Sequence, residues 1–146
     1  MLIDFDDAEL QRWPTPVRVA ELDGVKARLL WSLRRLALMA PLGTARCQAV
    51  HIALQRDFGD AGLGIEHLLR CWLVGLARTS DRRLAIGTPA CPLVTSDEAA
   101  LLALACHADL PWARPLLVAI AGTRAAGLLP LFAAVQVLVG DAPRSA

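Results

Sequence analysis

The chain has 146 residues, enough for one domain with its own hydrophobic core. Hydrophobic residues make up 55% of it and charged residues 20%, a balance that excludes an intrinsically disordered chain. The 15 basic and 14 acidic residues nearly cancel, so we expect no nucleic-acid partner, because such proteins carry a basic excess.

Composition also predicts the fold class. The chain has 27 Leu and 26 Ala against 5 Ile and 10 Val, and Leu and Ala favour helices over strands. We therefore predict an all-α fold, a single-domain bundle of five to six helices with one long irregular loop at about 79–94. An acidic, proline-containing N-terminal arm (1–23) precedes the helical domain (24–140), and a C-terminal tail (141–146) follows it.

In the first half of the chain, apolar residues recur at spacings of three and four. This periodicity predicts helices at about 24–40, 44–58 and 63–78. Thr44 is the expected N-cap of the second helix and Gly59 its stop.

In the second half, the strongest local signal is the capping box Thr95–Glu98, which predicts the start of a fourth helix. That helix is expected to end at about His107, and a fifth is expected to begin near Ala113. We expect Gly127 and Pro130 to divide the rest of the chain into two helices.

Residues 99–140 carry only three charges in 42 positions, which raises the question of a membrane span. A span needs about 20 nearly uninterrupted apolar residues. The longest charge-free run, 125–140, is shorter and contains two glycines and a proline. We therefore expect buried core helices and no transmembrane span, and leave peripheral membrane contact open.

Four cysteines are too few for a disulfide scaffold in a chain of this length. The first residues are acidic where a signal peptide is basic. Both observations predict a cytoplasmic protein with reduced thiols.

The cysteine and histidine residues are the one group in the sequence whose spacing suggests a metal or thiol site. Cys47 and His51 are four residues apart, and so are His67 and Cys71, a spacing at which two side chains on one helix can bind one metal ion. The first pair lies on the predicted core stripe and the second on the outer side of its helix. The two pairs would meet only if the second helix packed against the outer side of the third, so a structural role is favoured.

Cys91 lies in the long loop, into which the outer side of the third helix leads. A thiol or metal site at Cys91, Cys71 and His67 is therefore the alternative function. Against it, prolines flank Cys91 and acidic residues of the next helix oppose a thiolate. The sequence contains no CxxC motif, phosphate-binding glycine loop or nucleophile elbow, so we expect no cofactor and favour a protein that is not an enzyme.

The first helix is apolar on both sides, which is typical of a helix in an interface. Trp31 lies between Arg28 and Arg35 at helical spacing, and Leu38 follows one heptad later; these four residues are the candidate interface. A stack of guanidinium groups on the indole is the structural alternative. The favoured function is a non-enzymatic interaction module that self-associates through apolar helix faces into a homo-oligomer, with a dimer preferred.

A pocket between helices for a small molecule is a third hypothesis. Trp31, Trp72 or Trp112 would line it, with an arginine near its mouth. The sequence names no ligand for it.

Several motifs carry a family resemblance: Leu33–Ala37, Phe58–Gly59, Gly75–Arg78, and Cys91–Pro92 followed by Thr95–Leu102. From the first helix to about Gly140, the chain resembles a small bacterial family of α-helical proteins, a domain of unknown function with no assigned activity. Similar sequences are richer in cysteine before the Thr-x-x-Glu helix, whereas this chain keeps only Cys91 there. The resemblance implies a domain boundary and no mechanism.

Overall fold

The computed structural model describes residues 17–39 and 47–141. These residues form six α-helices, two short 3-10 segments and one pair of two-residue strands, in this order: β1 (Val17–Arg18), η1 (Val19–Glu21), α2 (Gly24–Met39), α3 (Gln48–Phe58), α4 (Ala61–Thr79), β2 (Leu93–Val94), α5 (Ser96–His107), α6 (Ala113–Ala121), η2 (Thr123–Leu128) and α7 (Leu129–Asp141). The predicted all-α bundle with its irregular loop is confirmed.

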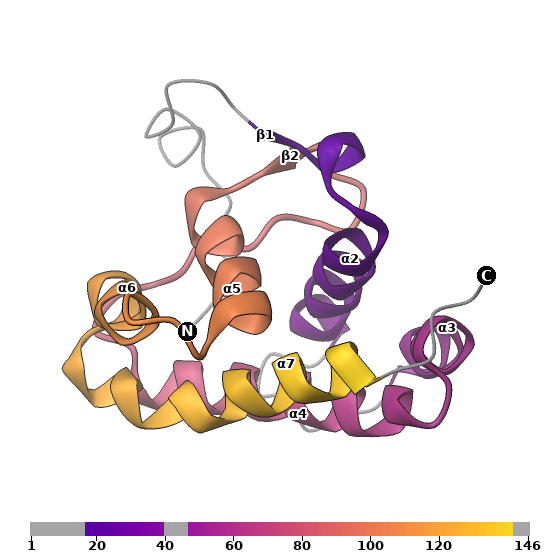
Figure 1. Cartoon of the computed structure of the whole chain (residues 1–146). Coiled ribbons are helices and arrows are strands. Elements are labelled where there is room, and N and C mark those ends of the chain that lie inside the picture. The colour runs from indigo at the N-terminus through magenta and orange to yellow at the C-terminus, as the bar shows by residue number, and fades with distance from the viewer. Residues whose placement is uncertain (1–16, 40–46, 142–146) are drawn as a thin grey trace.

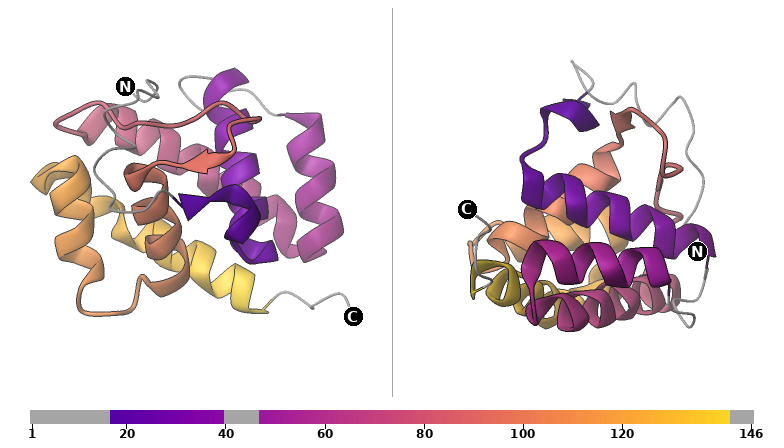
Figure 2. Two further views of the ribbon diagram at one scale, coloured as in Figure 1. Left: turned by 90° about the horizontal axis from the view of Figure 1, so that it is seen from above. Right: turned by 90° about the vertical axis from the view of Figure 1, so that its right-hand side faces the viewer.

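The helices form two layers (Figure 1). α4 and α7 lie side by side along the lower edge of that view, and α2 and α5 lie on top of them; both views of Figure 2 agree with this arrangement. α3 packs beside α4, and α6 packs beside α5. β1 pairs antiparallel with β2 at the end of the molecule opposite α4.

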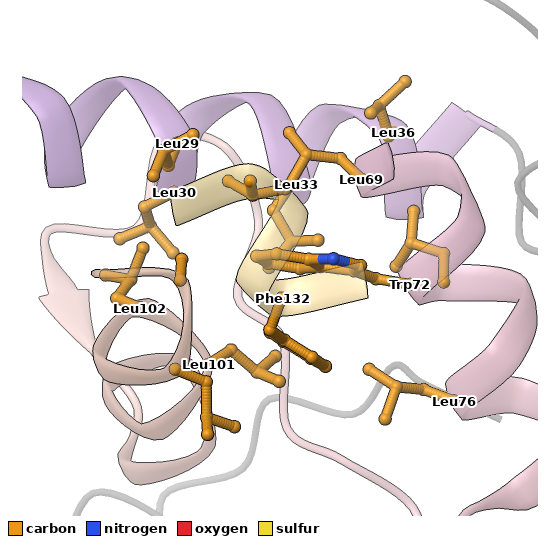
Figure 3. Packing of buried hydrophobic residues seen from close by; sticks show 14 of the residues in the cluster. Leu29, Leu30, Leu33, Leu36, Leu69, Trp72, Leu76, Leu101, Leu102 and Phe132 are labelled. Carbon is orange, nitrogen blue, oxygen red and sulfur yellow. The ribbon is translucent and has the colours of Figure 1, made fainter. Parts of the chain in front are cut away.

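Trp72 of α4 lies at the centre of the core (Figure 3). Its indole stacks on the ring of Phe132 from α7, with ring centroids 4.1 Å apart. Leucines from three helices close around this pair: Leu29, Leu30, Leu33, Leu36, Leu69, Leu76, Leu101 and Leu102. Aromatic and leucine side chains supply most of the apolar area that such a bundle buries.

Two glycines set the register between α4 and α7. A Cβ at Gly64 would lie 2.8 Å from Leu138, and a Cβ at Gly75 would lie 2.5 Å from Leu128. α4 therefore runs antiparallel to η2 and α7, since Gly64 meets Leu138 of α7 and the later Gly75 meets Leu128, the last residue of η2. Halfway between these contacts, residues 69–70 of α4 lie beside residues 133–134 of α7.

The second predicted helix begins later than expected. α3 starts at Gln48 with Cys47 as its N-cap, and the expected cap, Thr44, lies outside the described residues. The expected stop is confirmed, because α3 ends at Gly59, whose φ of 62° suits glycine.

The last helical region has one break where the sequence predicted it and one where it did not. α7 begins at Leu129, between Gly127 and Pro130, but α6 already ends before Gly122, which has a φ of 96°, and η2 lies between the two helices. A side chain at Gly122 would collide with the carboxylate of Asp81, so an approaching loop sets the break. Pro130 lies in the first turn of α7, where helices tolerate proline.

One stretch of the described residues, Thr123–Gly140, is long and apolar enough to cross a membrane. Its mean hydropathy is 1.5, yet only 22% of its residues are buried inside the protein. The expectation that these apolar helices are buried in the core is therefore met only in part.

Candidate functional site

One buried arginine holds the irregular loop that precedes β2. Arg34 of α2 is 2% exposed, and its Nε and Nη2 donate to the two carboxylate oxygens of Glu98 at 2.7 and 2.8 Å. Its Nη1 and Nη2 also donate to the carbonyl oxygens of Cys91 and Leu93, each at 2.7 Å. This guanidinium therefore joins α2, the loop and the start of α5.

The predicted capping box is confirmed. Thr95 Oγ1 accepts from the backbone N–H of Glu98, and Glu98 Oε1 accepts from the N–H of Thr95, both at 2.9 Å. The same side chains also bind the loop: Thr95 donates to the carbonyl of Ala85 at 2.7 Å, and Glu98 accepts from the N–H of Gly87 at 3.0 Å. These polar groups satisfy one another, which is the pattern of a structural network.

Asp97 anchors the start of the same loop. Its side chain is 1% exposed, accepts from the backbone N–H of Ala85 at 2.8 Å and forms an ion pair with Arg82. Both acidic residues of the first turn of α5 thus fix the loop in place, and the helix N-terminus is favourable for their charges.

A small cavity adjoins Arg34 between α2 and the loop. Its volume is about 90 Å³, well below the roughly 300 Å³ at which small-molecule sites begin. The tryptophans of the third hypothesis lie apart from it: Trp72 is buried in the core, Trp112 is 41% exposed, and Trp31 is partly buried on α2. Among the described residues, none of these tryptophans lines this cavity.

The three residues of the candidate thiol or metal site do not come together. The Cys91 thiol donates to the carbonyl of Leu93 at 3.5 Å, next to β2, whereas α4 runs along the opposite side of the molecule (Figure 1). Within 17–39 and 47–141, no group of three or more His, Cys, Asp or Glu side chains could hold a metal ion. What remains is a pair on α4, with Cys71 Sγ 3.7 Å from His67 Nε2.

Cys47 and His51 do not join this pair either. α3 packs against the side of α4 that carries the buried Glu66, and His51 Nδ1 lies 3.4 Å from its carboxylate. Cys47 is buried at the start of α3. The two Cys–His pairs therefore lie apart, with His51 of α3 against the Glu66 side of α4 and His67 beside Cys71 on another side.

Cys47 has an unusual thiol. Burial opposes its ionisation, but the nearby backbone N–H groups of Val50 and Ala49 and the Arg35 guanidinium outweigh burial and lower the pKa below its ordinary value. In Cys106 on α5, by contrast, burial raises the pKa. Sequence reasoning missed this difference because it depends on Cys47 being the N-cap, close to the backbone N–H groups at the start of α3.

The candidate interface on α2 is largely occupied by the protein itself. The Arg28 and Arg35 guanidinium carbons lie 5.0 and 5.3 Å from the centroid of the Trp31 ring, so the expected cation–π stack is present. Arg28 also pairs with Asp57 of α3 at 2.5 Å. Leu38, 65% exposed, is the one large apolar side chain of the four that points into solvent.

A different surface has the character expected of an interface. The side of the α4 and α7 layer that faces away from the core carries Leu63, 55% exposed, and Val137, 58% exposed. Helical periodicity places two rows of residues on it. We call these rows the α4–α7 outer face: Asp60, Leu63, His67, Cys71, Val74 and Arg78 along α4, and Pro130, Ala133, Ala134 and Val137 along α7. The sequence predicts that the charge-free run 125–140 is buried and does not predict this exposed face, because periodicity alone does not say which side of a helix is covered.

Comparison of the chain with protein-family models, with curated proteins and with solved structures finds no match. The resemblance drawn from its motifs therefore stays an expectation.

Proposed function

We propose that this chain is a non-enzymatic helical interaction module that forms a homodimer through the α4–α7 outer face. One observation carries the proposal: Thr123–Gly140 has a mean hydropathy of 1.5, but only 22% of its residues are buried within one copy. Many of its other apolar residues are half-buried against the core, and Val137 is its exposed large apolar side chain, so the outer side of α7 gains free energy when a partner covers it.

The order of residues along α4 favours a second copy as that partner. The outer row begins with exposed Asp60, ends with exposed Arg78 and has apolar Leu63 and Val74 between them. Neither terminal charge has an ion pair with another described residue. In an antiparallel pair related by a two-fold axis at residue 69, Asp60 of one copy faces Arg78 of the other, twice.

The two-fold axis at residue 69 of α4 also pairs the two copies of α7 antiparallel. Because residues 133–134 of α7 lie beside residues 69–70 of α4, the axis passes Ala133 and Ala134. Two small side chains allow the two copies of α7 to approach closely where they cross. Val137 then packs near Pro130 of the second copy. One two-fold axis therefore gives complementary contacts between the two copies along both α4 and α7.

The size of the face suits a modest dimer. α4 has 19 residues and is about 28 Å long, and two helices side by side are about 20 Å wide. The face thus covers about 560 Å² per copy, or about 1,100 Å² in a dimer, which lies near the lower limit for specific interfaces.

A membrane surface is the competing occupant. Helices that lie in a lipid interface carry an excess of lysine or arginine beside their apolar side, whereas the α4–α7 outer face carries one basic residue, Arg78, balanced by one acidic residue, Asp60. A second copy is therefore favoured. The four free cysteines accord with a reducing compartment, and we propose the cytoplasm.

Sedimentation velocity on the full-length protein tests the dimer. We expect a dimer at micromolar concentration and a folded monomer for Val137→Glu, with helicity checked by circular dichroism. Leu38→Glu is the matched control, because Leu38 is similarly exposed but lies on α2. A monomeric wild type, a dimer that only Leu38→Glu dissociates, or a monomer that binds lipid vesicles would overturn the proposal.

A charge exchange tests the antiparallel pairing. Asp60→Lys places like charges opposite each other in both symmetry-related contacts, and we expect it to weaken the dimer by about tenfold. The double variant Asp60→Lys with Arg78→Glu restores opposite charges and should recover the wild-type dissociation constant. Losses that simply add in the double variant would rule out this register.

A further inference from the structure

His67 and Cys71, a pair of side chains able to bind a metal ion, lie at the centre of the proposed dimer interface. The inference below rests on that dimer. His67 and Cys71 are symmetric about residue 69, so the axis that pairs Asp60 with Arg78 also places His67 opposite Cys71 of the second copy. Within one copy the two side chains already meet, with Sγ 3.7 Å from Nε2. Two such pairs would face each other across the axis.

We propose that the dimer binds one zinc ion on its two-fold axis, with His67 and Cys71 of both copies as the four ligands. Zinc in proteins prefers four tetrahedral ligands, and two thiolates with two imidazoles are a common set. One copy supplies only half of that set, and no third His, Cys, Asp or Glu completes it among the described residues. The site is thus incomplete without the second copy.

The chemistry of the surroundings favours this ion. A spacing of four residues on α4 places both ligands on one side of the helix, one turn apart. Zinc with two thiolates and two neutral imidazoles has no net charge, which suits a row on which Leu63 and Val74 are the next residues; Arg70, the half-buried residue before Cys71, is a charged neighbour on α4. Binding releases one proton from each thiol to solvent, and no electron is transferred.

Titration of the reduced, full-length protein with cobalt(II), which reports zinc sites by its spectrum, tests the stoichiometry. We expect saturation at one ion per two chains, with d–d bands of tetrahedral intensity and a thiolate-to-cobalt charge-transfer band. Cys71→Ser should abolish the charge-transfer band, and zinc should bind more than about 100-fold more weakly to it. Cys91→Ser and Cys106→Ser are matched controls and should retain both properties.

Val137→Glu tests whether the site needs two copies, because it keeps both ligands and removes the proposed apolar contact. We expect it to lose zinc binding by a similar factor, while Leu38→Glu binds as the wild type does. Binding of one ion per chain, or a charge-transfer band that survives in Cys71→Ser, would overturn the zinc site.

Sedimentation with and without a chelator separates the two proposals. A dimer that persists in chelator, with no cobalt spectrum on titration, rejects the zinc site and leaves the proposed dimer standing. A monomer that binds one ion per chain rejects both. A dimer strengthened by zinc in the wild type, but not in Cys71→Ser, supports both.

Discussion

Glu98 receives two hydrogen bonds from the guanidinium of Arg34, 64 residues earlier in the chain, and this ion pair fastens α2 to α5. Both side chains are at most 1% exposed. Taking two charges out of water costs about as much as their attraction returns, so the pair adds little net stability. Its effect is to hold the loop that contributes the carbonyls of Cys91 and Leu93 in one arrangement.

Removing one partner of this pair should be costly. Arg34→Met leaves the buried Glu98 carboxylate without its counter-charge, and we expect the free energy of unfolding to fall by about 3–5 kcal/mol in urea denaturation. Arg34→Met with Glu98→Gln buries no charge, so its loss should be smaller than the sum of the single losses. Additivity within about 0.5 kcal/mol would show that the two side chains are not coupled.

The capping box should contribute more than an ordinary cap. An N-cap hydroxyl is typically worth about 1 kcal/mol, but that of Thr95 also donates to Ala85, and the residue is fully buried. Thr95→Ala should therefore cost about 2–3 kcal/mol, and Thr95→Ser much less, because serine keeps both bonds. Ser96→Ala, one position inside the helix, is the control and should lower the denaturation midpoint less. Equal midpoints for Thr95→Ala and Ser96→Ala would contradict this.

What the sequence could predict is local. The core stripes of α2 and α4, the stop at Gly59 and the Thr95–Glu98 box follow from periodicity and from residues within one or two turns. For the same reason His67 and Cys71 could be placed together on the outer side of their helix. Each of these features has its cause within a few residues of the chain.

What the sequence missed has causes far along the chain. Nothing near Arg34 in the sequence marks it as buried, because its acceptors lie 57–64 residues later. The helix break occurs at Gly122 because the Asp81 carboxylate approaches it. Periodicity likewise cannot say which helix covers which side of α7, so its exposed apolar face was unforeseen.

Gly62 tests the close packing of α3 on α4. A Cβ there would lie 2.5 Å from the carbonyl oxygen of Leu54, a backbone atom that cannot move aside easily. Gly→Ala in a helix normally stabilises, but we expect Gly62→Ala to lower the free energy of unfolding by about 1–3 kcal/mol. Gly127→Ala, with no atom within 4 Å of its Cβ, is the control and should be neutral or stabilise by about 0.5 kcal/mol. A stabilised Gly62→Ala variant would show that the helices are farther apart.

The thiols of Cys47 and Cys106 should ionise at different pH. Burial raises the pKa of Cys106, whereas at Cys47 the helix N-terminal N–H groups and Arg35 outweigh burial and lower it. ¹³Cβ chemical shifts of cysteine-labelled protein, followed through a pH titration, report both thiols directly, including buried ones. Cys47 should titrate first, and Arg35→Gln should move its midpoint upward without moving that of Cys106.

The opposite changes in the pKa of Cys47 and Cys106 also determine how the free energy of unfolding changes with pH. Because the pKa of Cys47 is lower in the folded than in the unfolded chain, its ionisation contributes stability that is fully present above the unfolded value of about 9. This contribution is lost as the pH falls through the folded pKa. Cys47→Ser should therefore remove a rise in stability between those two pH values, whereas Cys106→Ser should remove a fall above pH 9. Paired urea denaturation series across this range measure both slopes, and a slope that Cys47→Ser leaves unchanged would show that the thiol is not stabilised as an anion.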